Sequence, residues 1–459
     1  MTRCALRGRP PRRADPTGFD RRLIAPMVLG SILNPVNSSM LAVALVPIGH
    51  AFGAAPPRTA WLISGLYLAT AVGQPVIGRL VDLHGPRRLY LLGTALAGAA
   101  GLLGTLAPGL WVLVASRVLL GLGTSAAYPA SMSLLRSEAE RTGRHSPAGV
   151  LATLSICNQV VSVTGPALGG LLIGAGGWRL TFAVNVPLSL ACLVLGARRL
   201  PRTTPAGVPK PRTDGAGMLL FAAALTAFVL FLMRPATAHW YLPVTGLAAG
   251  ALFARRELNA REPFIDLRVL GGNAPLLATY GRQLLAYTTS YAFLYGFGQW
   301  LQEGRGLSAP EAGLLMLPMP VTAVAVTALT GRRSRPRINL VAGALVQLLC
   351  CGTLLLLHAD SPAWLLVLIA AMAGIPQGLI GLANQNALYA QADPARMGSS
   401  AGLLRTSMYL GALLAAAANA LVFPTGATST GLHDLAALLL GVATAFLLVC
   451  AADRSLSRP

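Results

Sequence analysis

The chain has 459 residues, of which 54% are apolar and only 11% are charged, and its mean hydropathy is +0.62. A soluble protein needs a more highly charged surface, so this composition excludes a soluble globular fold and indicates a helical membrane protein. The formal net charge is +21, but basic residues hold membrane-protein loops in the cytoplasm, so we expect the lipid bilayer and no nucleic acid as partner.

We predict an all-α polytopic membrane protein. Apolar segments of about 20 residues, the length that spans a bilayer, recur almost from end to end. The arginines of the N-terminal tail precede an apolar run that is too long for a secretory signal, so we interpret the tail as cytoplasmic. The fourteen predicted transmembrane helices cover 23–48, 61–81, 88–107, 110–135, 148–175, 178–197, 215–233, 239–254, 274–301, 310–330, 338–357, 363–390, 397–423 and 434–451.

Arginine placement predicts the orientation of these helices. Of the 36 Lys and Arg residues, 29 fall in the tails and in the loops on the same side as the tails. Four fall in the opposite loops, and three lie inside predicted helices. Because basic residues are retained on the cytoplasmic side, both termini are predicted to be cytoplasmic.

The loops divide the helices into groups of six, two and six. The turn 331–337 holds the place in the second half that the turn 78–88 holds in the first. Internal repeats of this kind build secondary transporters, whose substrate site lies near the midplane between the halves. The predicted domains are a basic cytoplasmic tail (1–22), an N-terminal six-helix bundle (23–197), a linker with two extra helices (198–270), a C-terminal six-helix bundle (271–451) and a short cytoplasmic tail (452–459).

The first helix carries two amides, Asn34 and Asn37, which lie three residues apart and therefore share a face. Further on, Arg117, Arg282 and Arg405 are the three arginines inside predicted helices. A charge at the centre of a bilayer costs at least about 2.5–3.5 kcal/mol, so each is a candidate functional residue. The alternative is a structural arginine that is satisfied by backbone carbonyls or bound water.

The turn 78–88 joins the second and third helices. It places Asp82, Arg87 and Arg88 at the lipid–water boundary. Gly78 allows close helix approach, and Gly85 permits the tight turn.

The segment 165–170 combines Gly165, Pro166, Gly169 and Gly170 in one helix. Proline removes a helical hydrogen bond, and the glycines allow close packing. A simple packing kink is the alternative.

Two polar stripes follow in the second half. Tyr287, Tyr291 and Tyr295 stand at steps of four in the ninth helix, and packing or interfacial anchoring is an alternative role for them. Gln377 and Asn384 are seven residues apart and therefore share a face of the twelfth helix. Amides on a transmembrane face need partners or water.

Catalytic signatures are lacking. The sequence has no Walker A motif, no nucleophile elbow and no clustered Cys and His, so we predict no enzyme activity, no cofactor, no metal site and no disulfide framework. Every acidic residue falls in a loop or at a predicted helix end, so no membrane-buried proton carrier is evident.

These features together resemble the major facilitator superfamily. The spacing G-x-x-x-D-x-x-G-x-R-R from Gly78 to Arg88 resembles its signature loop, and the segment 165–170 resembles the antiporter signature of its exporters. The stretch 37–47 and the layout of six, two and six helices resemble the fourteen-helix drug:proton antiporter family, which has an aspartate where Asn37 stands. Simple proton coupling through this position is therefore not expected.

The resemblance implies a multi-pass transporter of the bacterial plasma membrane that exports drugs or other toxic small molecules. It implies alternating access, with protons as the coupling ion, and a cavity lined by the first, fourth, ninth and twelfth helices. It also implies a conformational latch at Asp82, Arg87 and Arg88, and we expect a monomer. The alternatives are an exporter of an anionic or polar endogenous metabolite with different coupling, suggested by the purely cationic buried charges, and a non-transporting membrane receptor.

Overall fold

The computed structural model describes residues 20–54, 56–59, 61–143, 148–202, 214–233, 237–331, 335–424 and 426–457. In these parts every regular element is a helix. Parts of the predicted tails and linker lie outside the described residues, as do two arginines of the turn 331–337. They are residues 1–19, 203–213, 234–236 and 458–459, with Arg332 and Arg333.

The first half of the chain follows the predicted helices closely, with two breaks. The span predicted at 110–135 divides at Ser125, and the one at 178–197 divides at Val184, two residues before Val186-Pro187. The helices are α1 (Ile24–Phe52), α2 (Pro56–Thr59), α3 (Trp61–His84), α4 (Pro86–Thr105), α5 (Leu110–Thr124), α6 (Ala127–Thr142), α7 (Ala148–Gly176), α8 (Leu180–Ala183) and α9 (Asn185–Arg199), after a 3₁₀ turn η1 (Arg21–Leu23).

In the described residues of the second half, one comparable break occurs at Leu317, where Pro318 begins a new helix as its first residue. The helices are α10 (Gly215–Met233), α11 (Tyr241–Asn259), α12 (Leu267–Gly272), α13 (Ala274–Glu303), α14 (Ala309–Met316), α15 (Pro318–Thr330), α16 (Pro336–Leu354), α17 (Ala363–Gln391), α18 (Met397–Val422) and α19 (Ser429–Ala452), with 3₁₀ turns η2 (Thr237–His239), η3 (Pro394–Arg396) and η4 (Arg454–Ser457).

Ten helical stretches of the described chain are long and apolar enough to cross a membrane, and the bent α1 would make eleven. Helix α13, which carries the polar stripe, is not in this set. The count of fourteen spans therefore stays a prediction.

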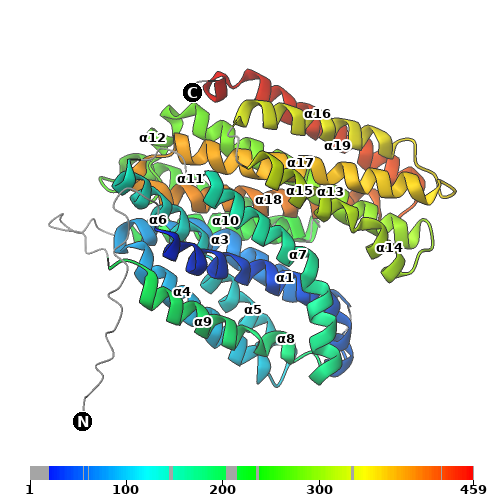
Figure 1. Cartoon of the computed structure of the whole chain (residues 1–459), viewed down its shortest axis with the longest axis horizontal. Coiled ribbons are helices and arrows are strands. Elements are labelled where there is room, and N and C mark those ends of the chain that lie inside the picture. The colour runs from blue at the N-terminus through cyan, green and yellow to red at the C-terminus, as the bar shows by residue number, and fades with distance from the viewer. Residues whose placement is uncertain are drawn as a thin grey trace, which may run out of the picture.

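The helices form two groups (Figure 1). Helices α1 to α9 pack among themselves, and so do α13 to α19, while α10 and α11 pair with each other and α10 touches α3 and α18. The two groups meet where α18 packs on α3 and α6, and where α15 and α17 pack on α7. A cavity between these contacts is thus bounded by both halves of the chain.

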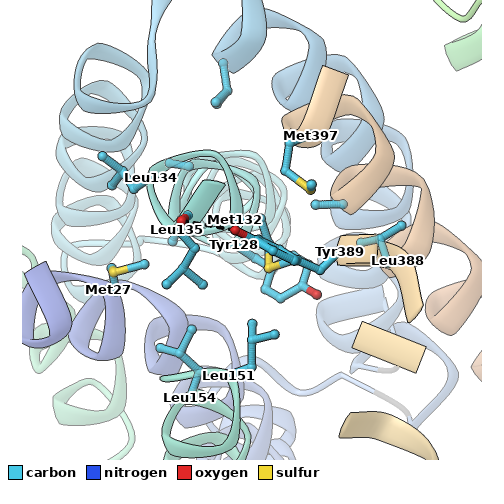
Figure 2. Packing of buried hydrophobic residues seen from close by; sticks show 14 of the residues in the cluster. Met27, Tyr128, Met132, Leu134, Leu135, Leu151, Leu154, Leu388, Tyr389 and Met397 are labelled. Carbon is cyan, nitrogen blue, oxygen red and sulfur yellow. Dashed lines mark hydrogen bonds between the residues drawn. The ribbon is translucent and has the colours of Figure 1, made fainter. Parts of the chain in front are cut away.

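One end of the junction is filled by apolar side chains from both groups (Figure 2). Tyr128 and Leu135 of α6 meet Leu388 and Tyr389 of α17 and Met397 of α18. The hydroxyl of Tyr389 donates to the carbonyl oxygen of Leu135 at 3.2 Å. At this end the two halves are therefore in direct contact.

Candidate functional site

A cavity of about 770 Å³ lies between the two halves. This volume is within the range of about 300–1,000 Å³ that small-molecule sites occupy. Its walls come from α1, α3, α5, α6 and α7 on one side and from α13, α14, α15, α17 and α18 on the other. The cavity reaches the exposed side chains of Gln302 and Glu303 at the end of α13.

Six of the ten residues predicted for this cavity line it. They come from α1, α13, α17 and α18, and they are Asn34, Tyr287, Tyr291, Tyr295, Gln377 and Arg405. The four others lie behind the wall, where they bind other protein groups. These are Asn37, Arg117, Arg282 and Asn384.

Asn37 and Arg117 belong to a buried polar cluster in the first half. The side-chain amides of Asn37 and Asn185 bond each other reciprocally, with Asn185 donating to Asn37 at 2.8 Å. Arg117 donates to the backbone oxygens of Leu62 at 3.1 Å and of Asn37 at 3.4 Å. Arg117 therefore has the carbonyl partners of a structural arginine, and neither side chain faces the cavity.

Arg282 is paired with a carboxylate. It bonds Asp453, just beyond the end of α19, and donates to the hydroxyl of Thr279 at 2.5 Å. Asn384 accepts from Arg282 at 3.4 Å and donates to Gln283 at 2.9 Å. These groups link α13, α17 and α19 outside the cavity, so Arg282 is not an unpaired cation.

Tyrosines dominate the cavity wall. Besides the predicted stripe on α13, the rings of Tyr67, Tyr128 and Tyr409 line it from α3, α6 and α18. The ring centroids of Tyr67 and Tyr409 are 5.8 Å apart, and successive rings of the stripe are 5.8 and 5.7 Å apart. Six of the chain's ten tyrosines thus gather in one cavity. Tyr67, Tyr128 and Tyr409 each stand alone in their stretch of sequence, without the periodic spacing of the α13 stripe, so no sequence pattern predicts them.

Amides and hydroxyls complete the wall, and some of them join the two halves. Gln159 of α7 donates to Thr327 of α15 at 3.1 Å, and Gln385 of α17 donates to Ser155 of α7 at 3.3 Å. Among the described residues that line the cavity, Glu303 is the single carboxylate. No group of His, Cys, Asp and Glu in the described part of the chain could hold a metal ion.

The closed end of the junction contains the residues of the turn 78–88. Asp82 accepts hydrogen bonds from the backbone N–H groups of Gly398 and Ser399, at the start of α18 in the other half. A Cβ atom on Gly78 would collide with the backbone of Gly398, so the glycine allows α3 and α18 to cross closely. Asp82 therefore joins the two halves directly.

The other residues of this turn act within the first half. Arg87 donates to the carbonyl oxygen of Ala197 in α9 at 2.7 Å, and Arg88 is exposed. Gly85 has a φ of 88°, which favours glycine, and it precedes Pro86 at the start of α4. The contact between the halves thus involves Asp82 and Gly78, and not the arginine side chains.

The glycines of the segment 165–170 differ in their surroundings. A Cβ atom on Gly165 would collide with Ser39, and one on Gly169 would lie 3.1 Å from the Cα of Met40, both in α1. Gly170 has no such neighbour within 4 Å, and Pro166 lines the cavity. Two of the three glycines thus permit close packing of α7 on α1.

Comparisons with known proteins agree on the family. The sequence profile of the Major Facilitator Superfamily matches residues 27–416. The uncharacterized MFS-type transporter YwoD of Bacillus subtilis is 33% identical over 402 residues, which cover 86% of this chain and 88% of that protein. A multidrug resistance protein B homolog of Mycobacterium tuberculosis is 32% identical over 368 residues, which cover 77% of this chain and 66% of that protein.

A solved structure agrees on the fold. The human organic anion transporter MFSD10 (TETRAN) matches with a TM-score of 0.69 over 94% of this chain and 99% of that one. The sequence identity is 15%, so this likeness concerns the fold alone.

Proposed function

Because the chain belongs to the major facilitator superfamily, it is a multi-pass transporter of the bacterial plasma membrane, and we propose that it exports small molecules by alternating access. Export is supported by the similarity to a multidrug resistance protein, since a membrane transporter confers resistance by moving a compound out of the cell. The substrate would enter the tyrosine-lined cavity between the two halves, which rock around it.

The single observation that carries this proposal is the asymmetry of the cavity along the helices. Near the start of α13, Tyr280 donates to Ser400 and Asp82 holds the neighbouring Ser399, so the halves touch. The cavity reaches Glu303, 23 residues further along α13, which is about 35 Å at 1.5 Å per residue. One end is closed and the other reaches exposed residues, as one state of an alternating-access cycle requires.

The proposed topology has fourteen spans, grouped as six, two and six, with both termini in the cytoplasm. The domain boundaries are those predicted above, at 1–22, 23–197, 198–270, 271–451 and 452–459. With this orientation the Asp82 end faces the cytoplasm, and the cavity opens to the outside. We further propose that the protein works as a monomer.

Proton antiport is the proposed coupling, and Asp82 is its leading candidate carboxylate. Asn37 cannot titrate, and it lies in an amide pair with Asn185. Protonation of Asp82 would remove charge from an acceptor of three hydrogen bonds, weaken its hold on α18 and favour opening of the cytoplasmic end.

The test uses inside-out vesicles with an acid interior, prepared with and without the protein. Cationic dyes, neutral antibiotics and organic anions are added in turn while internal pH is recorded. We expect one class to discharge the gradient only in vesicles that contain the protein. Uptake of a radiolabelled compound without any change of pH would disprove proton antiport and leave transport intact. Absence of uptake for every compound would disprove export.

A further inference from the structure

We propose that the transported ligand is an aromatic organic anion whose negative charge binds to Arg405. This inference rests on the proposed transport function and adds the substrate class to it. It depends on the charge, the aromatic rings and the unpartnered amides of the cavity.

Arg405 is the one arginine among the described residues that line the cavity. Its guanidinium carbon lies 4.1 Å from the ring centroid of Tyr128, so the group is stacked face-on against an aromatic ring. Its Nη1 is directed at the sulfur of Met408, at 3.6 Å, and no salt bridge to Arg405 occurs within the described chain. A stacked guanidinium keeps its edge free to bind a carboxylate with two N–H groups.

Neither Asp82 nor Glu303 is a salt-bridge partner of Arg405. Asp82 binds the start of α18 at Ser399, and Arg405 lies about 9 Å further along that helix at 1.5 Å per residue. Glu303, the cavity carboxylate, follows Tyr287 by about 24 Å along α13, whereas Tyr287 packs in the cluster that contains Met408, which Arg405 contacts. A cation that faces a cavity without a carboxylate partner favours a ligand with negative charge.

The tyrosine rings around Arg405 favour a ligand with a flat aromatic ring system. Tyr287, Tyr291 and Tyr409 line the same cavity as Arg405 and pack together with Met408, which Arg405 contacts. Stacked aromatic pairs are stabilised at centroid distances of about 4.5–7 Å, the spacing that these tyrosines already keep among themselves. A flat aromatic ligand next to Arg405 could therefore stack on the tyrosine rings while its carboxylate binds the guanidinium.

Buried amides supply acceptors for the rest of the ligand. The side-chain oxygens of Gln74, Asn158 and Gln159 are buried and have no hydrogen-bond partner within the described chain. All three residues line the cavity, and Gln74 is only 3% exposed. A buried acceptor without a hydrogen-bond donor is unfavourable in free energy. They fit a hydroxyl or amide N–H on the ligand, away from its charge.

The test compares three probes that share one hydroxynaphthalene ring system and carry a negative, a neutral or a positive group: 6-hydroxy-2-naphthoate, its carboxamide and its aminomethyl analogue. Binding to the full-length protein in nanodiscs of neutral lipid is measured by equilibrium dialysis at pH 7. The variants are Arg405→Gln and Arg405→Lys. Arg179→Gln is the matched control, because Arg179 also stacks on a ring, at 4.4 Å from Trp178, but is exposed and does not line the cavity.

We expect the wild-type protein to bind the naphthoate roughly tenfold to a hundredfold more tightly than the carboxamide, as a charged hydrogen-bond pair provides. Arg405→Gln should abolish this preference, Arg405→Lys should keep part of it, and the control should leave it unchanged. Equal or tighter binding of the neutral or cationic probe by the wild-type protein, a preference that survives Arg405→Gln, or no binding of any probe overturns the proposal.

Two readouts keep the outcomes distinct. Melting temperature and elution volume report whether Arg405→Gln is folded, and if it is not, the wild-type probe series and Arg405→Lys decide the matter. In the vesicle assay, movement of neutral or cationic compounds without any movement of the naphthoate overturns the anion assignment and keeps the export function. Charge-selective binding without transport of any compound keeps the anion assignment and overturns the export function.

Discussion

Asp82 accepts hydrogen bonds from both the backbone N–H and the hydroxyl of Ser399, at 2.8 and 2.5 Å, and so fixes the end of α3 to the start of α18. With the N–H of Gly398 at 2.7 Å, one carboxylate satisfies three donors. Two of these donors are backbone groups at a helix N-terminus, which prefers a negative charge. The carboxylate thus stabilises the closed end of the junction.

Asp82→Asn should therefore reduce transport at least tenfold while leaving the amount of protein in the membrane unchanged. An asparagine amide offers one acceptor oxygen instead of two, and its NH₂ group would face the donors of α18. Export is measured in vesicles, and protein is measured by immunoblot. Asp360→Asn is the control, because Asp360 is exposed in a loop. Normal export by Asp82→Asn would rule out the latch.

Gly165→Val should disturb the packing of α7 on α1, whereas Gly170→Ala should not. The added side chain at position 165 would collide with Ser39, while position 170 has no neighbour within 4 Å. We expect Gly165→Val to lower the melting temperature in detergent and to reduce transport. Both variants lie in one short segment of α7, so each serves as the reference for the other. Equal behaviour of the two would show that close packing at Gly165 is unimportant.

The Asn37–Asn185 pair predicts that single substitutions of these residues destabilise the protein more than their effects in the double substitution would suggest. Asn37→Leu should destabilise the protein by about 1–3 kcal/mol, because the buried side-chain oxygen of Asn185 loses its donor. Replacing both asparagines by leucine should recover much of this loss, since an apolar pair leaves nothing unsatisfied. Apparent melting temperatures of the two single variants and the double variant test this. If the double variant lowers the melting temperature by the sum of the two single decreases, the two side chains do not act as a pair.

The sequence predicted helix positions well where apolarity alone decides them. The range 148–175 corresponds to α7 and 363–390 to α17, each within one residue at either end. Breaks such as the one at Leu317 were missed, because a helix that restarts at a proline keeps the same hydropathy. Helix ends are therefore predictable from composition, while breaks within a membrane-length segment are not.

The candidate site was less predictable, because partners lie far apart in the sequence. The Arg282–Asp453 pair joins residues 171 positions apart, so an arginine that stands alone in its helix proved to be paired. Polarity within an apolar helix identifies residues that need partners, and only the packing decides whether the partner is the protein or the cavity. Arg405 and Arg117 give the same signal in sequence, yet only Arg405 lines the cavity.

Glu257 of α11 predicts a pH-dependent stability. It lies beyond the predicted span that ends at residue 254, its side chain is fully buried, and it accepts from the N–H of Ile265 at 3.0 Å. Burial is the main reason why the pKa of Glu257 is raised to about 7. The neighbouring charge of Asp214 also raises this pKa, while the Ile265 bond and Arg256 lower it. Arg79 is the other charged group that interacts with it.

The folded protein therefore holds a proton that the unfolded chain releases near pH 4.5. Between about pH 4.5 and 7 the unfolded state binds fewer protons, so the free energy of unfolding falls as pH rises. The melting temperature of the wild-type protein in detergent should decrease from pH 5 to 8. A glutamine side chain cannot ionise, so Glu257→Gln should avoid the decrease of roughly 1–3 kcal/mol in the free energy of unfolding that the wild-type protein undergoes by pH 8. The control is Glu140→Gln, at an exposed surface pair with Arg136. Parallel pH profiles for wild type and Glu257→Gln would show that this carboxyl is ionised at neutral pH.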